Sequence, residues 1–577
     1  MAVELSIELS TLSFLTLVIV LLTLRHYCGK SYNQAPWILY TLLLFSYFIC
    51  FIPVPLLLCD VQAAISTKAY NPTVHTFWAV IYWSTQALAW FVLPVCKSYL
   101  EQGHFSPRKR LYAAISLNVR MYIAMGLVVL ILVLWVLVKE GIDNFQALIE
   151  IGRAASNAFG LFLSMSFLGY GLVEVPRSWF FWANLERYKM WHEFTANNIW
   201  DAAEGSQIDW FDLQEEIKKI TREVKEGHEL YRFVEAINRT VEEVNADIHA
   251  SCPNVLSTRE GSRRLSHSHS REENEDAEQE FTEVSLVALN GKVKQIAHQL
   301  LKTEYEWQHH RKQYYFLEDA LKAKADQAPK SLRTRRSHPE WLGPWGHFVD
   351  LAEYWYWVSL RAFVLRSIGA MLLLVSLAVL WSEAVTPMNP SWSLVNQVIN
   401  VMPEGVMMQL VILALLAYIT CCSYWTLFHL KLFDMYSLVP HHSNPAHLCW
   451  AGYNLTRFIL PLCFNFLTIG DLMDRDAATS DISFIRVFGN MPHLGLLGDR
   501  FRRWFAPTLL ICITLFTACN GFARSLSLCD LKSFVTVDHY TDEEVSEGKE
   551  ILRTARKKDK SEREMEEALS SDDEDQL

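Results

Sequence analysis

Long runs of nearly uncharged residues constrain this chain more than any other feature of its sequence. A bilayer core of about 30 Å requires about twenty apolar residues in a helix, because no water is present there to satisfy an open backbone. The sequence therefore predicts an all-α fold, a polytopic membrane protein of about nine transmembrane helices. The expected spans are Leu9–Leu24, Trp37–Cys59, Phe77–Cys96, Met121–Val138, Ala155–Val173, Ser367–Trp381, Val406–Leu427, Leu448–Gly470 and Ala506–Phe522.

The charged residues are concentrated in two stretches outside these runs. Pro176–Asp350 has a net charge of −6 and Ser525–Leu577 a net charge of −8. This distribution excludes a soluble globular protein, and the lack of a net basic stretch excludes nucleic-acid binding. We therefore expect a bundle of five spans at 1–175, a polar loop at 176–350, a bundle of four spans at 351–528 and a charged, disordered tail at 529–577.

Charges beside the first run set the expected orientation. Glu4 and Glu8 precede this run, whereas Arg25 and Lys30 follow it. Because basic residues stay in the cytosol, the N-terminus is expected outside. With nine spans, the polar loop and the C-terminus then lie in the cytosol. The arginine-rich loop before the ninth span does not fit this rule.

Two apolar stripes run through the polar loop. One extends from Ile217 to Ile248 and the other from Leu286 to Leu321, both with coiled-coil spacing. They predict helices at about 208–250 and 284–322, joined by a disordered connector at 251–280. We therefore expect the two helices to form an antiparallel coiled-coil hairpin in the cytosol. In the favoured interpretation, the two stripes only cover each other. In the alternative, they leave a groove for partners.

The sequence contains no recognisable catalytic constellation. We find no metalloprotease helix, nucleophile elbow or Cys/His pair with the required spacing, so we expect no enzyme and no cofactor. Histidines cluster in one loop between spans and again in the connector, and we interpret them as loop residues rather than metal ligands. They are His441, His442, His447, His267 and His269.

Arg457 is a charged residue deep in the eighth run. Pro461 has no N–H for the carbonyl of Arg457, so we expect a kink between them. Asn465 lies four residues further on, which places the three on one helical face. A charge at this depth requires water, carbonyls or a carboxylate. Glu174 and Glu383 are candidate partners for Arg457.

Two interpretations of this candidate intramembrane polar site are open. In the first, Arg457 is a structural anchor that snorkels and ties spans together. In the second, the kink forms a polar pocket that serves as a switch or a substrate site. Both interpretations predict that Arg457 faces protein or a water-filled cavity and never faces lipid.

Small residues form a ridge on the fifth run. Ser156, Gly160 and Ser164 lie four residues apart, a spacing that lets two helices approach closely. The alternative is that these residues simply face lipid. We favour helix packing.

Two segments resemble phosphorylation sites. Ser266 follows two arginines and a leucine, as basophilic kinases prefer. Ser570 and Ser571 precede an acidic run, as an acidophilic kinase prefers. A phosphate would add about two negative charges at either position.

Three segments resemble a known family. They are VIYWSTQ at Val80–Gln86, FGLFLSMSFLGYGLVEVPRS at Phe159–Ser178 and LPLCFNFL at Leu460–Leu467. In order and spacing, nearly the whole chain resembles the limb-region-1-like (LMBR-like) integral membrane protein family. It is most similar to the LMBR domain-containing protein 2 branch.

The resemblance implies a function without catalysis. It implies a non-enzymatic multi-pass regulator or scaffold at the plasma membrane, with endosomes as a second location. Its partners would be the lipid bilayer and G-protein-coupled, adrenergic-type receptors, reached through the cytosolic hairpin. The alternative is a transporter or escort of the cobalamin-exporter or lipocalin-receptor type. The sequence does not indicate the oligomeric state.

Overall fold

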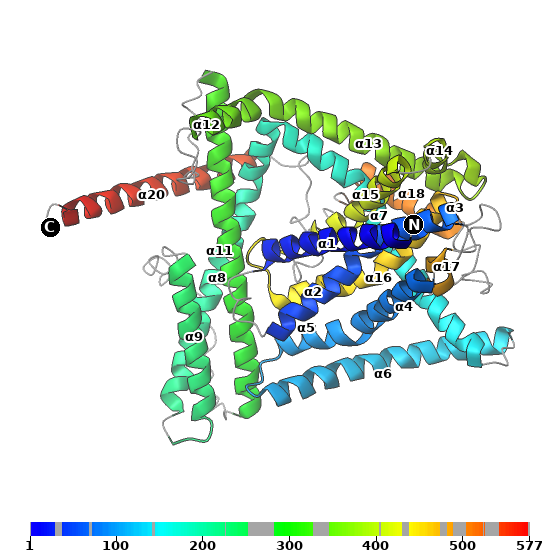
Figure 1. Ribbon diagram of the computed structural model, residues 1–577. Helices are drawn as coiled ribbons and strands as arrows, with labels where there is room; N and C mark the ends of the chain where they lie inside the picture. Colours follow the sequence, from blue (N-terminus) through cyan, green and yellow to red (C-terminus); the bar gives the residue numbers. More distant parts are fainter. Residues whose placement is uncertain are drawn as a thin grey trace. The chain divides into compact units, whose positions relative to one another are not determined.

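The fold is built from helices that divide into two compact units (Figure 1). The computed structural model describes residues 2–28, 37–67, 72–140, 145–224, 227–251, 282–326, 346–402, 406–429, 438–472, 482–488, 504–522, 524 and 542–574. In these ranges every regular element is a helix, apart from one bridge between Cys28 and Ser443. This agrees with the predicted all-α class.

The first unit, here called the membrane unit, comprises Met1–Gln102, Ser106–Pro176 and Met371–Gly521. Its helices are apolar over most of their length. They are α1 (Ala2–Tyr27), α2 (Trp37–Phe51), α3 (Pro53–Thr67), α4 (Pro72–Ala87), α5 (Leu93–Glu101), α6 (Pro107–Glu140), α7 (Phe145–Ala183, to Pro176), α13 (Arg361–Val385, from Met371), α14 (Leu394–Val401), α15 (Val406–His429), α16 (Pro445–Ile469), α17 (Ser483–Phe488) and α18 (Ala506–Ala518). A π-helical turn, Leu88–Val92, joins α4 to α5.

Seven helical segments of the described chain are long and apolar enough to cross a membrane. They are Leu9–Tyr27, Trp37–Ala63, Pro72–Glu101, Pro107–Val128, Ser156–Ala183, Leu351–Val385 and Val406–His429. The predicted count of nine spans is therefore not confirmed. The eighth predicted span forms a 25-residue helix, α16, whose polar residues lower its hydropathy, and the described part of the ninth, α18, has 13 residues.

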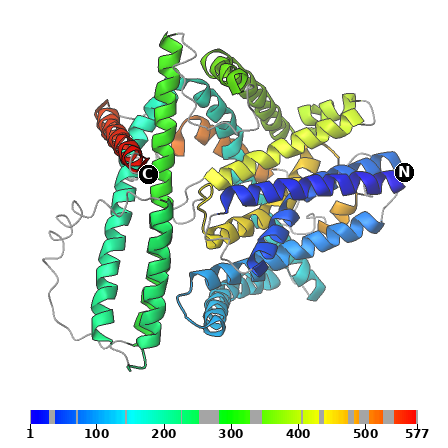
Figure 2. The same ribbon diagram turned by 60° about the vertical axis from the view of Figure 1, so that its left-hand side comes forward.

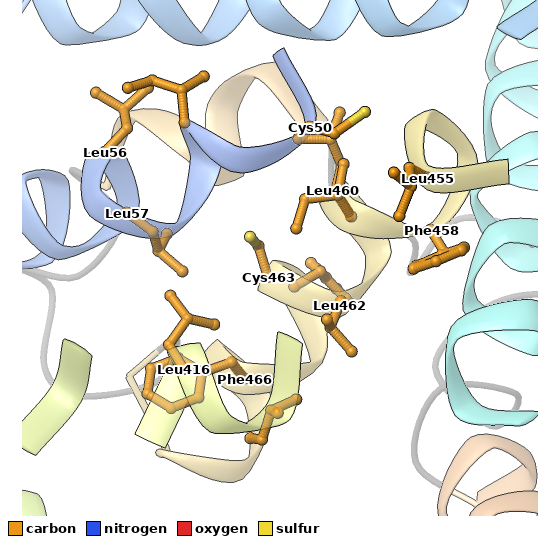
Figure 3. Close-up of a cluster of buried hydrophobic side chains, with 14 of the residues drawn as sticks. Cys50, Leu56, Leu57, Leu416, Leu455, Phe458, Leu460, Leu462, Cys463 and Phe466 are labelled. Atoms are coloured by element: carbon orange, nitrogen blue, oxygen red, sulfur yellow. The ribbon is translucent and has the colours of Figure 1, made fainter. Parts of the chain in front are cut away.

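Helix α16 forms the centre of the membrane unit. Eighteen of its 25 residues are buried, including Leu455, Phe458 and Phe466. They pack against Cys50 and Leu57 of α2 and α3 and against Leu416 of α15 (Figure 3). Helix α16 also carries polar side chains such as Asn465, which lipid cannot hydrogen-bond but neighbouring helices can. The sequence of α16 therefore fits a position inside the bundle rather than one in contact with lipid.

The second unit, here called the polar unit, comprises Gly103–Phe105, Arg177–Ala370 and Phe522–Leu577. Its helices are α8 (Leu185–Glu223), α9 (Tyr231–Ser251), α11 (Glu283–Asp326), α12 (Gly346–Trp355), the first turns of α13 and α20 (Asp542–Glu574). Helices α8, α9 and α11 lie side by side (Figures 1 and 2). The pairs Tyr188–Gln313 and Lys292–Glu216 show that α8 and α11 are antiparallel.

The predicted single helix at 208–250 is wrong. Helix α8 ends at Glu223, and α9 begins at Tyr231. Gly227 in the connecting turn has a φ of 105°, a conformation that side chains disfavour. Because Trp210 donates a hydrogen bond to Asn245, α9 folds back along α8. The apolar stripes therefore cover a core of three helices, and the two-helix coiled-coil hairpin is not confirmed.

The predicted disorder is wrong for 542–574, the described part of the tail, because α20 packs on α8 and α11. Leu552 is fully buried beside Trp307 and Tyr314. A Cβ atom on Gly548 would lie 1.8 Å from the carbonyl oxygen of Glu193, so only glycine fits at this crossing. Arg556 forms ion pairs with the carboxylates of Glu318 and Asp319 in α11. Arg311 and Asp559 add a third ion pair of 2.7 Å.

Two buried histidines join α8 and α11. Nδ1 of His192 lies 3.1 Å from Nδ1 of His310, and Nε2 of His310 lies 2.8 Å from the backbone carbonyl oxygen of His192. The carbonyl accepts only from N–H, so His310 carries its proton on Nε2 and accepts from Nδ1–H of His192. Burial is the main cause that lowers the pKa of His310 to about 4, and it lowers the pKa of His192 further.

We expect the substitution Arg556→Glu to release α20 from the polar unit. It would lose both ion pairs and place like charges together, at a cost of about 1–2 kcal/mol, since the groups are partly exposed. Hydrogen exchange of the α20 amides should rise, and adding Glu318→Arg and Asp319→Arg should restore protection. Lys557→Glu, at an exposed position of the same helix, is the control. Equal exchange in both charge-reversal variants would contradict this docking.

The histidine pair should make the polar unit less stable in acid. Both histidines have pKa values below the ordinary 6.5, so the unfolded state binds more protons than the folded state. Their stabilising contribution is complete above about pH 6.5 and is lost as the pH falls towards 4, by about 3 kcal/mol for each histidine. Chemical unfolding at several pH values would measure this slope. In His192→Phe/His310→Leu the slope should be shallower, and an unchanged slope would contradict the assignment.

Candidate functional site

The candidate site lies where α16, α7 and the α4–α5 segment meet inside the membrane unit. A cavity is lined here by Arg457 and Pro461 from α16, Ser156 and Gly160 from α7, and Trp90 from the π-helical turn. The structure therefore brings together Arg457 and Pro461 of the predicted polar site and Ser156 and Gly160 of the predicted small-residue ridge. π-Helical turns inside helices are frequent at functional sites.

The guanidinium of Arg457 is held by aromatic rings. Its central carbon lies 4.0 Å from the ring centre of Tyr453, 4.7 Å from that of Trp90 and 5.7 Å from that of Phe159. The negative face of an aromatic ring attracts a cation, by about 2 kcal/mol or more where water is excluded. Nε of Arg457 has no hydrogen-bond partner among the described residues. The rings therefore replace the expected carboxylate.

Two prolines remove backbone N–H donors from the helices that meet at the candidate site. Pro94 has no N–H for the carbonyl of Trp90, and the hydroxyl of Tyr122 in α6 donates to that carbonyl instead. Pro461 likewise has no N–H for the carbonyl of Arg457. Helix α16 continues through Pro461.

Gly160 allows α7 to contact this turn of α16 closely. A Cβ atom at Gly160 would lie 2.6 Å from both the carbonyl oxygen of Arg457 and Cγ of Pro461. Two further glycines of α7 make similar contacts, Gly169 with α18 and Gly171 with α15. Small residues of this kind let helix backbones approach in a membrane. The predicted ridge thus faces protein, and Ser164 on the same ridge is fully buried.

The expected pairing of Arg457 with Glu174 or Glu383 is wrong: no such ion pair occurs in the described ranges. The carboxylate of Glu383 lies within α13, is 1% exposed, and accepts a hydrogen bond from Asn465. Asn465 does not line the cavity. The three residues are spaced four apart along α16, but each step of four positions rotates by about 40° around a helix. Asn465 therefore reaches Glu383 rather than the cavity.

The size of the cavity bears on the two interpretations of Arg457. The space open to the centre of a water molecule has a volume of about 20 Å³. This is enough for about one water. A substrate does not fit such a space. We therefore favour the structural-anchor interpretation over a substrate pocket, with the cation held by rings instead of snorkelling.

A buried carboxylate nearby positions α17. Asp60 is 2% exposed and accepts hydrogen bonds from Nε1 of Trp78 and from the backbone N–H groups of Ser483 and Phe484. The last two belong to the first turn of α17, whose free N–H groups favour a carboxylate. Phe488 at its other end lines the cavity of Arg457. Asp60 therefore ties α3, α4 and α17 together beside the candidate site.

The remaining sequence predictions lie elsewhere. Ser570 and Ser571 fall in the last turns of α20, and Ser266 lies outside the described residues, as do His267 and His269. In the described part of the chain, no three His, Cys, Asp or Glu side chains gather as metal ligands. Kinase use of the three serines stays a prediction.

Sequence reasoning missed the aromatic partners of Arg457. Trp90 precedes Pro94 by four residues, and Tyr453 precedes Arg457 by four, a spacing that places the last two on one helical face. The spacing of Tyr453 and Arg457 could have predicted their contact from the sequence. The contact between Trp90 and Arg457 was not predictable from the sequence, because it depends on how α4, α5 and α16 pack.

Comparison with known proteins identifies relatives over nearly the whole chain. The model of the family described as "LMBR1-like membrane protein" matches residues 5–522. The human "G-protein coupled receptor-associated protein LMBRD2" is 27% identical over 496 residues, covering 84% of this chain and 68% of the relative. The Drosophila melanogaster "LMBR1 domain-containing protein 2 homolog" is 28% identical over 505 residues, covering 85% of this chain and 70% of the relative. No solved structure matches the chain.

We expect Gly160→Leu to destabilise the membrane unit. Its side chain would collide with the backbone of Arg457 and with Pro461, at a cost of about 1–3 kcal/mol for overpacking. The thermal unfolding temperature of the detergent-solubilised protein should fall. Gly126→Leu is a matched control in α6, because a Cβ atom there meets nothing within 4 Å. Equal unfolding temperatures for the two variants would show that α7 and α16 do not make this contact.

Proposed function

This chain belongs to the LMBR1-like membrane protein family, and we propose that it is a non-enzymatic regulator or scaffold that associates with G-protein-coupled receptors. It is a multi-pass membrane protein. The observation that carries the proposal is its similarity, over 84% of its length, to relatives named G-protein coupled receptor-associated proteins. Modulation of adrenergic-type receptors is the more specific form of the proposal.

Electrostatics supports a role for the polar unit in this association. The cytosolic loops of multi-pass proteins are rich in Lys and Arg, so a receptor presents a basic surface to the cytosol. The two polar stretches of this chain carry net charges of −6 and −8. Complementary charges of this kind increase association rates and select partners. Asp201 and Glu215 in α8 are exposed acidic residues that can contribute to such a surface.

The proposal includes an orientation. We place the N-terminus outside and the polar unit and C-terminus in the cytosol, with the protein at the plasma membrane. The basic residues after the first span support this orientation. An N-terminal epitope should bind antibody on intact cells, and a C-terminal epitope should bind only after permeabilisation.

Proximity labelling tests the association most directly. A labelling enzyme on the C-terminus should tag a co-expressed adrenergic-type receptor, with a response to agonist. In Asp201→Lys/Glu215→Lys, receptor labelling should fall by about threefold or more, because each reversed charge costs up to about 1 kcal/mol. Surface expression should stay unchanged, since both side chains are exposed.

The matched control reverses basic residues of the same helix. Lys218→Glu/Lys219→Glu changes two exposed charges in α8 in the opposite sense and should preserve or increase receptor labelling. Equal loss in both variants would contradict charge complementarity. Agonist-independent labelling confined to lysosomal transporters would contradict the receptor role and favour the transport or escort alternative.

A further inference from the structure

A second cavity lies in the polar unit, at the elbow between α7 and α8. Helix α7 ends at Ala183, Asn184 is extended, and α8 begins at Leu185. The cavity also meets the end of α11 and the start of α13. The space open to the centre of a water molecule has a volume of about 180 Å³ here. The cavity therefore has room for several waters. A phosphate group with part of its attached headgroup fits in this space.

Arg361 lines this cavity with a buried guanidinium that keeps one N–H donor unpaired. The side chain is only 6% exposed, and its central carbon lies 4.4 Å from the ring centre of Trp357 and 6.0 Å from that of Tyr188. Its Nη1 is buried without a hydrogen-bond partner in the described part of the chain. A buried guanidinium donor left unpaired costs free energy, so the arrangement is incomplete without an acceptor. The two rings hold the donor in position for a ligand.

Further positive charge surrounds the cavity. Lys324 from α11 and Arg366 from α13 are exposed on its lining, against one carboxylate, that of Glu186. In the ranges described here these three side chains form no ion pair. The N-terminus of the 39-residue helix α8 adds a partial positive charge at the same place. The ligand that this group attracts is an anion, and the planar fork of arginine matches phosphate oxygens.

The sequence around the cavity indicates its depth in the membrane. The candidate span Ser156–Ala183 ends here, and the charge-free run of the next span begins just after Arg366. Both segments carry clusters of aromatic residues at this level: Trp179, Phe180, Phe181 and Trp182 in α7, and Tyr354, Trp355, Tyr356 and Trp357 before α13. Such clusters mark the interface between hydrocarbon and headgroups. The exposed apolar side chains of Trp355, Leu360 and Phe363 leave lipid-facing surface beside the cavity.

We propose that this elbow cavity binds the phosphate of an anionic phospholipid headgroup, with Arg361 as its central ligand and Lys324 and Arg366 at its rim. Basic pockets between helices at the membrane surface are suited to such headgroups. The acyl chains lie along the exposed apolar surface near Leu360 and Phe363. The bound lipid links α7, α8, α11 and α13.

The test uses purified full-length protein in detergent, with thermal unfolding as the readout. Short-chain phosphatidic acid should raise the unfolding temperature, and phosphatidylcholine should not. In Arg361→Gln the apparent affinity for phosphatidic acid should fall by about tenfold or more, because a charge-assisted hydrogen bond is lost. Since Arg361 is buried, Lys324→Gln/Arg366→Gln provides a second variant at exposed positions. It should lower the affinity by about threefold to tenfold.

Matched controls separate this site from general charge attraction. Arg187→Gln removes an exposed charge from the first turn of α8 without touching the cavity lining and should keep wild-type affinity. Glycerol phosphate should bind much more weakly than phosphatidic acid. Wild-type affinity in both cavity variants, or an equal loss in Arg187→Gln, would overturn the proposal. Glycerol phosphate binding as tightly as the lipid would overturn the assignment to lipid and indicate a soluble phosphate ligand.

Discussion

A half-buried cation on the central apolar helix sets the arrangement of the membrane unit. Arg457 lies in the middle of α16, which is surrounded by other helices and buried along most of its length. A guanidinium cannot enter such a place unless something replaces its hydration. Three aromatic rings do so. Because these groups come from different helices, satisfying one charge fixes how α16 and the α4–α5 segment meet.

Small residues and buried polar groups complete this arrangement. Gly160 lets α7 contact the turn of α16 that carries Arg457, and Asp60 holds α17 beside the same cavity. The polar unit uses a related principle at its elbow, where Trp357 and Tyr188 hold Arg361. In each case one buried donor, Nε of Arg457 or Nη1 of Arg361, has no hydrogen-bond partner in the described chain, but the cavity beside Arg361 is larger. The cavity beside Arg457 holds about one water, whereas the cavity beside Arg361 has room for the anion that we propose as its ligand.

The sequence predicted the features that depend on local pattern. Charge-free runs gave the apolar helices, and the spacing of Ser156, Gly160 and Ser164 gave the packing face of α7. Features that depend on tertiary contact were not predictable. Glu383 pairs with Asn465, and neither position indicates the other. Similarly, the charge of the tail suggested disorder and concealed the apolar spacing of Leu552 and Ala555, which packs α20 against α8 and α11.

The central claim is that aromatic rings, and not a carboxylate, stabilise Arg457. Double-mutant cycles on the unfolding free energy of the purified protein test it, pairing Arg457→Leu with Trp90→Leu and, separately, with Glu383→Gln. The account predicts a coupling energy of about 1–2 kcal/mol between Arg457 and Trp90. For Arg457 and Glu383 it predicts additivity within about 0.5 kcal/mol. Additivity with Trp90 together with strong coupling to Glu383 would contradict it.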